Sequence, residues 1–291
     1  MSDTPSQPDP AEPLTTELEA LDTGIQSPAA LEQASAPPQT HLEPIIVFDH
    51  VSIAFGDHKV LDDVSFSVKR GETLCILGRS GVGKSVSLRL LMGFLKPESG
   101  SLRVEGQEIA GLDEEGMRAV RKRVTMVFQN GALFDSLSVR ENIAFPLREH
   151  GGLTEDQVEQ LVDQLIGLVG ADDVVNLLPA SLSTGRKRAV AIARALAAQP
   201  EIVLYDEPTT MVDPLIAKRL GNLIQRLKKQ LGFTSIVVTH DIRFAGRLAD
   251  TVLFLDAGKA RFFGPWSEFL VTQDEHVRQF LTLDEYVLPP G

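Results

Sequence analysis

Eight consecutive residues have the spacing of a loop that binds phosphate groups. They read G-x-x-x-x-G-K-S and comprise Gly78, Arg79, Ser80, Gly81, Val82, Gly83, Lys84 and Ser85. Glycines let such a loop curl so that successive backbone N–H groups point at one polyphosphate, and the positive end of the following helix adds to the attraction. The lysine reaches the outer phosphates, and the serine hydroxyl is a ligand for Mg²⁺.

The alternative is a chance match in a glycine-containing loop, and the flanking residues argue against it. Residues 73–77 form a continuous apolar run that predicts a buried strand, and residues 85–95 carry apolar side chains at helical spacing. Strand, loop and helix in this order are the context in which the motif binds phosphate. The sequence therefore predicts a polyphosphate site here.

Two adjacent carboxylates follow a second apolar run, residues 202–205. They are Asp206 and Glu207. At the carboxyl end of a strand, Asp206 can hold a metal ion through water, and Glu207 can reach an attacking water as a general base. Taken alone, the pair could equally cap the start of a helix. Paired with the phosphate loop, the catalytic interpretation is favoured.

Two further polar residues follow predicted strands. His240 comes after residues 235–239, and Gln129 comes after residues 124–128. Because ligands of α/β proteins bind at the carboxyl ends of strands, His240 is a candidate sensor of the terminal phosphate. Gln129 is a candidate for contact with the metal or the water. Alone, the histidine would more often be structural, and the glutamine an ordinary loop amide.

The elements that must position these residues alternate along the chain. Buried apolar strands separated by helices predict a mostly parallel sheet covered on both faces, whereas the strands before residue 110 look antiparallel. Expected strands cover residues 45–48, 64–68, 73–77, 124–128, 202–205, 235–239 and 252–255. Expected helices cover residues 85–95, 155–169, 187–198, 214–231 and 242–248.

Charge is distributed unevenly along the 291 residues. The first 45 contain eight Asp or Glu, no Lys or Arg, and eight of the 17 prolines. We predict a disordered, acidic, proline-rich tail over residues 1–44, because such a segment buries too little apolar surface to fold. The mildly acidic remainder argues against a nucleic-acid partner. One cysteine, Cys75, permits no internal disulfide, and no apolar run is long enough to cross a bilayer.

Taken in order, these motifs resemble the ATP-binding cassette (ABC) of transporters over residues 45–270. The resemblance implies an ATPase that uses ATP and Mg²⁺ and works as a homodimer, with each ATP between the phosphate loop of one copy and the signature motif of the other. It implies that Phe55 stacks on adenine, that Gln129 is the Q-loop glutamine and that His240 is the switch histidine. Asp206 and Glu207 correspond to the Walker B pair, and Asp213 to the D-loop. Residues 182–186 correspond to the signature motif, in which Ser183 and Gly185 would contact phosphate.

The resemblance extends to fold and domains. It implies an α/β P-loop NTPase with a mainly parallel core sheet, an antiparallel β subdomain and a helical subdomain at about residues 130–195. Residues 271–291 would form a C-terminal appendage that packs on the cassette or on the opposing subunit, and a frayed tail is the alternative.

Residues 128–148 look like the ATPases of bacterial phospholipid-trafficking, MCE-type transporters, as do the basic residues Lys187 and Arg188 after the signature. This implies a protein on the cytoplasmic face of the inner membrane, with a multi-span permease and an MCE-type lipid-binding subunit as partners. Phe134, Phe145 and Leu147 would receive a helix of the permease. Alternatively, these side chains simply pack the helical subdomain.

The sequence departs from the family pattern at the signature and D-loop. Thr184 replaces a glycine, Arg186 replaces the usual glutamine or methionine, and Met211 and Val212 stand where small residues are common. The threonine Cβ can block close approach to phosphate, while Arg186 adds positive charge nearby. We expect a working but slow ATPase. Two rival hypotheses are a soluble, non-transport ABC protein and a nucleotide-sensing module that scarcely hydrolyses ATP.

Overall fold

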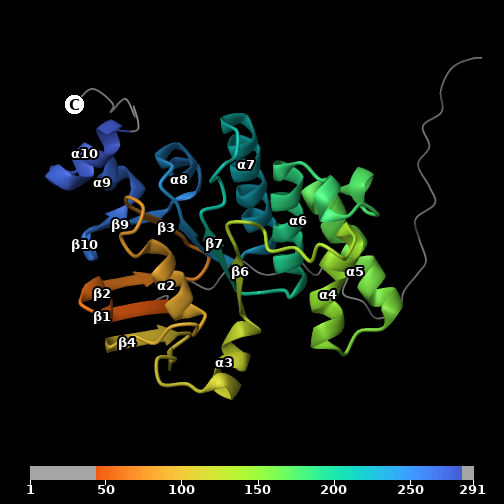
Figure 1. The fold of residues 1–291 in the computed structure, drawn as a ribbon, viewed down its shortest axis with the longest axis horizontal. Coiled ribbons are helices and arrows are strands. Elements are labelled where there is room, and N and C mark those ends of the chain that lie inside the picture. The colour runs from red at the N-terminus through yellow and green to blue at the C-terminus, as the bar shows by residue number, and fades with distance from the viewer. Residues whose placement is uncertain (1–43, 284–291) are drawn as a thin grey trace, which may run out of the picture. The chain divides into compact units, whose positions relative to one another are not determined.

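The computed structural model describes residues 44–283, and these lie within one compact unit (Figure 1). The tail predicted for residues 1–44 falls, apart from Pro44, outside the described residues. So does the end of the predicted appendage, residues 284–291.

A six-stranded sheet forms the core and has the order β10-β9-β3-β8-β7-β6. Its strands are β3 (Thr73–Leu77), β6 (Val124–Val127), β7 (Ile202–Asp206), β8 (Thr234–Val238), β9 (Thr251–Asp256) and β10 (Lys259–Pro265). All neighbouring pairs are parallel except β9 and β10. Every residue of β3, β7 and β8 is buried, as continuous apolar strands covered on both faces require. The predicted parallel core is confirmed.

A second sheet is antiparallel and has the order β2-β1-β4-β5. It consists of β1 (Ile46–Phe55), β2 (His58–Val68), β4 (Ser99–Val104) and β5 (Gln107–Glu108). On β1, Ile46 and Phe48 are buried and alternate with Val47, which is partly exposed. This sheet shares an apolar cluster with one face of β3, β7 and β8. The antiparallel subdomain expected before residue 110 is therefore present.

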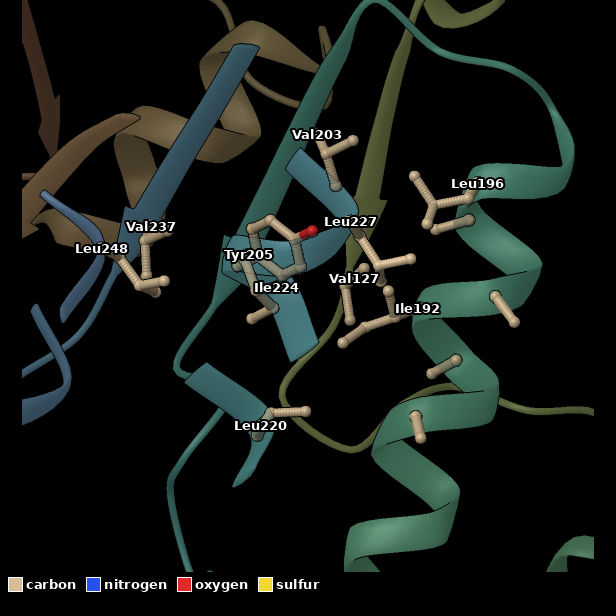
Figure 2. Packing of buried hydrophobic residues seen from close by; sticks show 14 of the residues in the cluster. Val127, Ile192, Leu196, Val203, Tyr205, Leu220, Ile224, Leu227, Val237 and Leu248 are labelled. Atoms are coloured by element: carbon tan, nitrogen blue, oxygen red, sulfur yellow. The ribbon is translucent and has the colours of Figure 1, made fainter. Parts of the chain in front are cut away.

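Helices complete the fold. They are α2 (Lys84–Leu91), α3 (Glu114–Arg121), α4 (Val139–His150), α5 (Glu155–Val169), α6 (Thr184–Ala197), α7 (Pro214–Leu231), α8 (Ile242–Leu248), α9 (Trp266–Val271) and α10 (Glu275–Leu283), with short 3₁₀ turns at Asp172–Val174 and Pro179–Ser181. Helices α4, α5 and α6 lie together in Figure 1 and share one apolar cluster. Figure 2 shows Ile192 and Leu196 of α6 directed toward the β7 side of the sheet, where Tyr205 is fully buried.

Some boundaries differ from those the sequence predicts. Helix α2 ends at Leu91 rather than at residue 95, because Gly93 turns the chain with φ 68°. Helix α6 begins at Thr184 rather than at residue 187, since Ser183 caps it and accepts a hydrogen bond from the Arg186 N–H. Helix α4 was not predicted, because Pro146 interrupts its pattern.

The described part of the C-terminal segment packs on the cassette. Phe269 of α9 and Val277 and Leu281 of α10 are fully buried, in the same apolar cluster as Phe254 of β9. The rings of Phe254 and Phe280 lie 5.0 Å apart, centroid to centroid. Up to Leu281, the segment therefore packs on the core rather than forming a frayed tail.

Candidate functional site

The phosphate loop connects β3 to α2, and two of its glycines are sterically required. Gly78 and Gly83 have φ values of 149° and 100°. A Cβ on Gly83 would lie 2.7 Å from the Val60 carbonyl oxygen, and a Cβ on Gly78 would meet the Leu255 carbonyl. The loop is thus wedged between β2 and β9, and a side chain at either position would push it outward.

Lys84 is the first residue of α2 and only 5% exposed. Its ammonium donates to the carbonyls of Gly78 at 2.9 Å and Arg79 at 3.0 Å. It also lies 3.3 Å from Oε1 of Glu207. The loop therefore holds a buried cation where a phosphate group cradled by the loop would meet it.

Ser85 and Asp206 form a hydroxyl–carboxylate pair under the loop. The Ser85 hydroxyl donates to Oδ1 of Asp206 at 2.6 Å. Burial, with a smaller contribution from the charge of Glu207, raises the pKa of Asp206 despite this hydrogen bond. A buried carboxylate with a neighbouring hydroxyl suits Mg²⁺, which takes few protein ligands together with phosphate oxygens. The donor set fits the predicted metal.

Glu207 adopts a backbone conformation that is uncommon for a residue with a side chain, with φ 46°. Its backbone N–H donates to the Val238 carbonyl at 2.9 Å, so the strained turn stands at the end of the sheet. Oε2 lies 2.8 Å from Nδ1 of His240 and accepts from the Thr210 hydroxyl at 3.3 Å. The next helix, α7, begins only at Pro214, so these carboxylates do not cap a helix.

These groups border one depression of about 450 Å³. Predicted site residues that line it are Phe55, Ser80, Gly81, Gly83, Lys84, Ser85, Gln129, Glu207 and His240. The Phe55 ring is 51% exposed and thus accessible to a flat ligand. Asp206 does not line the depression, but it accepts a hydrogen bond from Ser85, which does. Gly78, Arg79 and Val82 belong to the phosphate loop and do not line the depression either.

Four lining residues were not predicted: His58, Val60, Val86 and Thr210. His58 and Val60 belong to the strand that pairs with Phe55 across a hairpin turn, where Phe55 faces His58. The turn residues Gly56 and Asp57 were the available sequence signal. Thr210 carried no signal beyond its closeness to Glu207.

Beyond the phosphate loop and Asp206, three predicted ligands, Ser183, Gly185 and Asp213, lie outside this depression. Ser183 caps α6, and Asp213 caps α7 by accepting from the Leu215 N–H at 2.8 Å. The starts of these helices touch, because a Cβ on Gly185 would lie 2.8 Å from the Ile216 side chain. We call residues 182–186 and 211–213 the signature surface. Met211, at 94% exposed, projects from it.

Arg186 does not add free positive charge to this surface. Its guanidinium donates to the Gly170 carbonyl at the end of α5 and lies 3.0 Å from Oδ1 of Asp173. Asp173 therefore offsets part of the positive charge that the sequence predicts here. The arginine instead ties the start of α6 to α5.

The three apolar residues predicted to receive a permease helix divide into two groups. Phe134 and Phe145 are 42% and 39% exposed, with ring centroids 4.7 Å apart, while Leu147 is only 5% exposed. Leu147 therefore packs the helical subdomain, as the alternative hypothesis held. Phe134 and Phe145 form an exposed aromatic pair. Within residues 44–283, no helix is long and apolar enough to span a bilayer.

Comparison with known proteins gives consistent matches. The family model described as ABC transporter matches residues 61–210. The intermembrane phospholipid transport system ATP-binding protein MlaF of Haemophilus influenzae is 38% identical over 237 residues, 81% of this chain and 90% of that protein. The methionine import ATP-binding protein MetN of Brucella abortus is 39% identical over 254 residues, which are 87% of this chain and 68% of that protein.

Two solved structures share the fold. CbiO1 from Clostridium perfringens, part of the ABC transporter complex cbiONQ, has a TM-score of 0.74 and 29% identity, over 83% of this chain and 95% of that one. The ATP-binding cassette MJ0796, in a dimeric post-hydrolysis state bound to ADP and Pi, has a TM-score of 0.69 and 28% identity. The match covers 76% of this chain and 98% of that one.

Proposed function

The chain belongs to the ABC transporter family, and on that premise we propose that it is the ATPase subunit of a transporter that moves phospholipid. The observation that carries the ATPase assignment is the grouping of Lys84, Ser85, Glu207 and His240 on one depression at the carboxyl ends of parallel strands. Their chemistry is that of phosphoryl transfer to water.

In the proposed reaction, the loop N–H groups and Lys84 bind the phosphates of ATP, and Phe55 stacks on the adenine. Glu207 accepts a proton from the attacking water, while Lys84 stabilises the charge of the phosphoryl group. His240 orients Glu207 through the 2.8 Å contact of its Nδ1. Ser85, Asp206 and Gln129 would hold Mg²⁺, which neutralises phosphate charge.

Two copies would act together. The signature surface carries Ser183, Gly185 and Asp213, which do not border the depression of their own chain. A head-to-tail homodimer brings this surface onto the phosphates bound by the other copy. The similar cassette MJ0796 is dimeric, which supports this proposal.

Hydrolysis is tested by Glu207→Gln in the full chain. We expect this variant to retain Mg-ATP binding and to lose phosphate release by at least about a hundredfold, the usual contribution of a general base. Glu201→Gln is the matched control. Glu201 stands just before the first residue of β7, whereas Glu207 follows its last, and Glu201 pairs with Arg70. Single-turnover phosphate release measures both and also shows whether the altered signature makes turnover slow. Unchanged release by Glu207→Gln would reject its role.

The phospholipid assignment rests on residues 128–148 and on the similarity to MlaF. Identity alone does not decide the substrate, since MetN, a methionine import protein, is equally similar. We propose a peripheral position on the cytoplasmic face of the inner membrane, with a multi-span permease and an MCE-type subunit as partners. The exposed pair of Phe134 and Phe145 would receive the permease helix.

Affinity purification of the full chain from a detergent extract tests these partners. We expect a multi-span subunit and bound phospholipid, and loss of both in Phe134→Asp. Phe263→Asp is the control, because Phe263 has the same 42% exposure on β10. A complex that binds methionine and no lipid would contradict the substrate, and absence of a membrane subunit would favour a soluble ABC protein.

A further inference from the structure

Helix α6 carries a buried cation that the proposed mechanism does not use. Arg188 is 6% exposed. Its guanidinium donates to two backbone carbonyls, that of Phe128 at 3.3 Å and that of Thr210 at 3.4 Å. Both distances are long for N–H···O hydrogen bonds. Within residues 44–283, Nε of Arg188 is buried without a hydrogen-bond partner, and none of the ion pairs found there includes this side chain.

This arrangement contributes little to the stability of the fold. A buried charge without a counterion loses its hydration, and two weak hydrogen bonds do not offset that loss. Burial alone lowers the pKa of Arg188, with no opposing contribution from a carboxylate. An apolar side chain of similar length would fill the position at a lower cost.

The two carbonyls belong to segments that carry candidate catalytic residues. Phe128 directly precedes Gln129, and its carbonyl also accepts the Gly131 N–H at 2.8 Å. This turn lies on α6, because a Cβ on Gly131 would be 3.4 Å from the Ala191 Cβ. Arg188 therefore holds the turn that presents Gln129.

The second carbonyl leads to the general base. Thr210 is bonded to Glu207 twice: its backbone N–H donates to the Glu207 carbonyl at 3.3 Å, and its hydroxyl donates to Oε2 at 3.3 Å. A guanidinium that holds the Thr210 carbonyl therefore constrains the carboxylate of Glu207. This matters because Glu207 occupies a strained turn, with φ 46°.

Arg188 also lies near the signature surface. It follows Ser183, which caps the same helix, by five residues, or roughly 7 Å along the axis. We propose that Arg188 is a positioning residue for ATP hydrolysis, which holds the Gln129 turn and the Glu207–Thr210 turn to the signature helix so that the three move together. The proposal rests on the proposed function and adds a specific link within that site.

The test is Arg188→Met in the full chain. Because Arg188 does not line the depression that would bind the nucleotide, the dissociation constant for Mg-ATP should change by less than about threefold. The rate of single-turnover phosphate release should fall roughly tenfold to a hundredfold, as expected for a misplaced catalytic group. The urea midpoint should stay unchanged or rise, because an unpaired buried charge has been removed. A merely structural role would instead lower the midpoint and the rate together.

Arg194→Met is the matched control. Arg194 lies on the same helix and burial also lowers its pKa, but its guanidinium lies over Phe134, 5.1 Å from the ring centroid. It does not line the nucleotide depression. Basal phosphate release by the isolated chain should therefore be the same as that of the parent protein.

A double-mutant comparison isolates the link through Thr210. If Arg188 acts partly through Thr210, then Arg188→Met should reduce the rate of phosphate release by a smaller factor in a Thr210→Val background than in the parent chain. Should Arg188→Met fail to fold, Arg188→Lys provides the same comparison, since one ammonium retains the charge but replaces the two-pronged donor.

The outcomes separate this inference from the proposed function. An unchanged rate in Arg188→Met, fully additive losses, or loss of rate only together with the urea midpoint would overturn the positioning role. In each case the parent chain would still show hydrolysis that depends on Glu207. If the parent chain shows no such hydrolysis, both proposals fail.

Discussion

Gly83→Ala, paired with Gly81→Ala, tests how the phosphate loop is held. Both glycines have positive φ, 100° and 85°. They differ in what a methyl group would meet. At Gly83 the Cβ would lie 2.7 Å from the Val60 carbonyl oxygen and 2.8 Å from Cδ2 of Leu61, whereas at Gly81 nothing lies within 4 Å. The pair separates backbone strain from steric conflict.

The expected magnitudes follow from these contacts. An alanine forced into a left-handed conformation costs about 1–2 kcal/mol, and both variants incur this cost. Overpacking against backbone adds about 1–3 kcal/mol, and only Gly83→Ala incurs it, because the Val60 carbonyl belongs to β2 and has little freedom to move. The free energy of unfolding should therefore fall by about 2 kcal/mol more in Gly83→Ala than in Gly81→Ala.

Urea denaturation of the full chain measures the stability difference, and calorimetry measures Mg-ATP binding. Gly83→Ala should also weaken nucleotide binding, because relief of the clash displaces Lys84, the adjacent residue. Equal losses of stability in the two variants, or unaltered nucleotide affinity in Gly83→Ala, would show that the loop is not wedged against β2 as described.

Three further predictions concern other parts of the chain. Burial raises the pKa of Glu108, but hydrogen bonds from Ser101 and from backbone N–H groups outweigh it, so the pKa is lowered overall. The charged carboxylate therefore stabilises the fold above its unfolded pKa, and this stabilisation is lost as pH falls. Glu108→Gln should accordingly reduce the urea midpoint at pH 7 and much less near pH 3. Tyr205→Phe removes a buried hydroxyl that has no partner within the described residues and should raise the free energy of unfolding by up to about 1 kcal/mol, and a clear loss would reveal an unrecognised partner. Met211→Asp should leave Mg-ATP binding intact and weaken ATP-dependent self-association in sedimentation, unlike Leu231→Asp at the far end of α7; equal self-association of the two would exclude Met211 from the dimer interface.

The sequence predicts the core elements well where pattern and packing agree. Residues 73–77, 155–169, 214–231 and 242–248 form β3, α5, α7 and α8 with the predicted bounds. Continuous apolar runs leave a buried strand little alternative, and the ends of α7 are set by Asp213 and Gly232.

One missed feature, helix α4, had a local sequence signal, whereas the others depend on tertiary contacts. Helix α4 contains Pro146, yet Ser138 and Glu141 form a capping box that starts it. His58 and Val60, which also line the depression, are brought there by strand pairing, for which the turn residues Gly56 and Asp57 were the only sequence signal. In the same way, Arg188 reads in sequence as one of several basic residues, and only its burial between two loops distinguishes it.

The central claim is that two copies close head to tail on ATP, and cysteine cross-linking tests it directly. Cys75, the only native cysteine, is fully buried, and burial raises its pKa, so it gives little background reaction. Ser80→Cys on the exposed phosphate loop and Thr184→Cys on the exposed signature surface are each made in the Glu207→Gln chain. Mixing the two with Mg-ATP should give an intermolecular disulfide, absent without nucleotide and absent when either variant is incubated alone. Equal cross-linking of a single variant with itself, or no ATP-dependent product in the mixture, would contradict the head-to-tail arrangement.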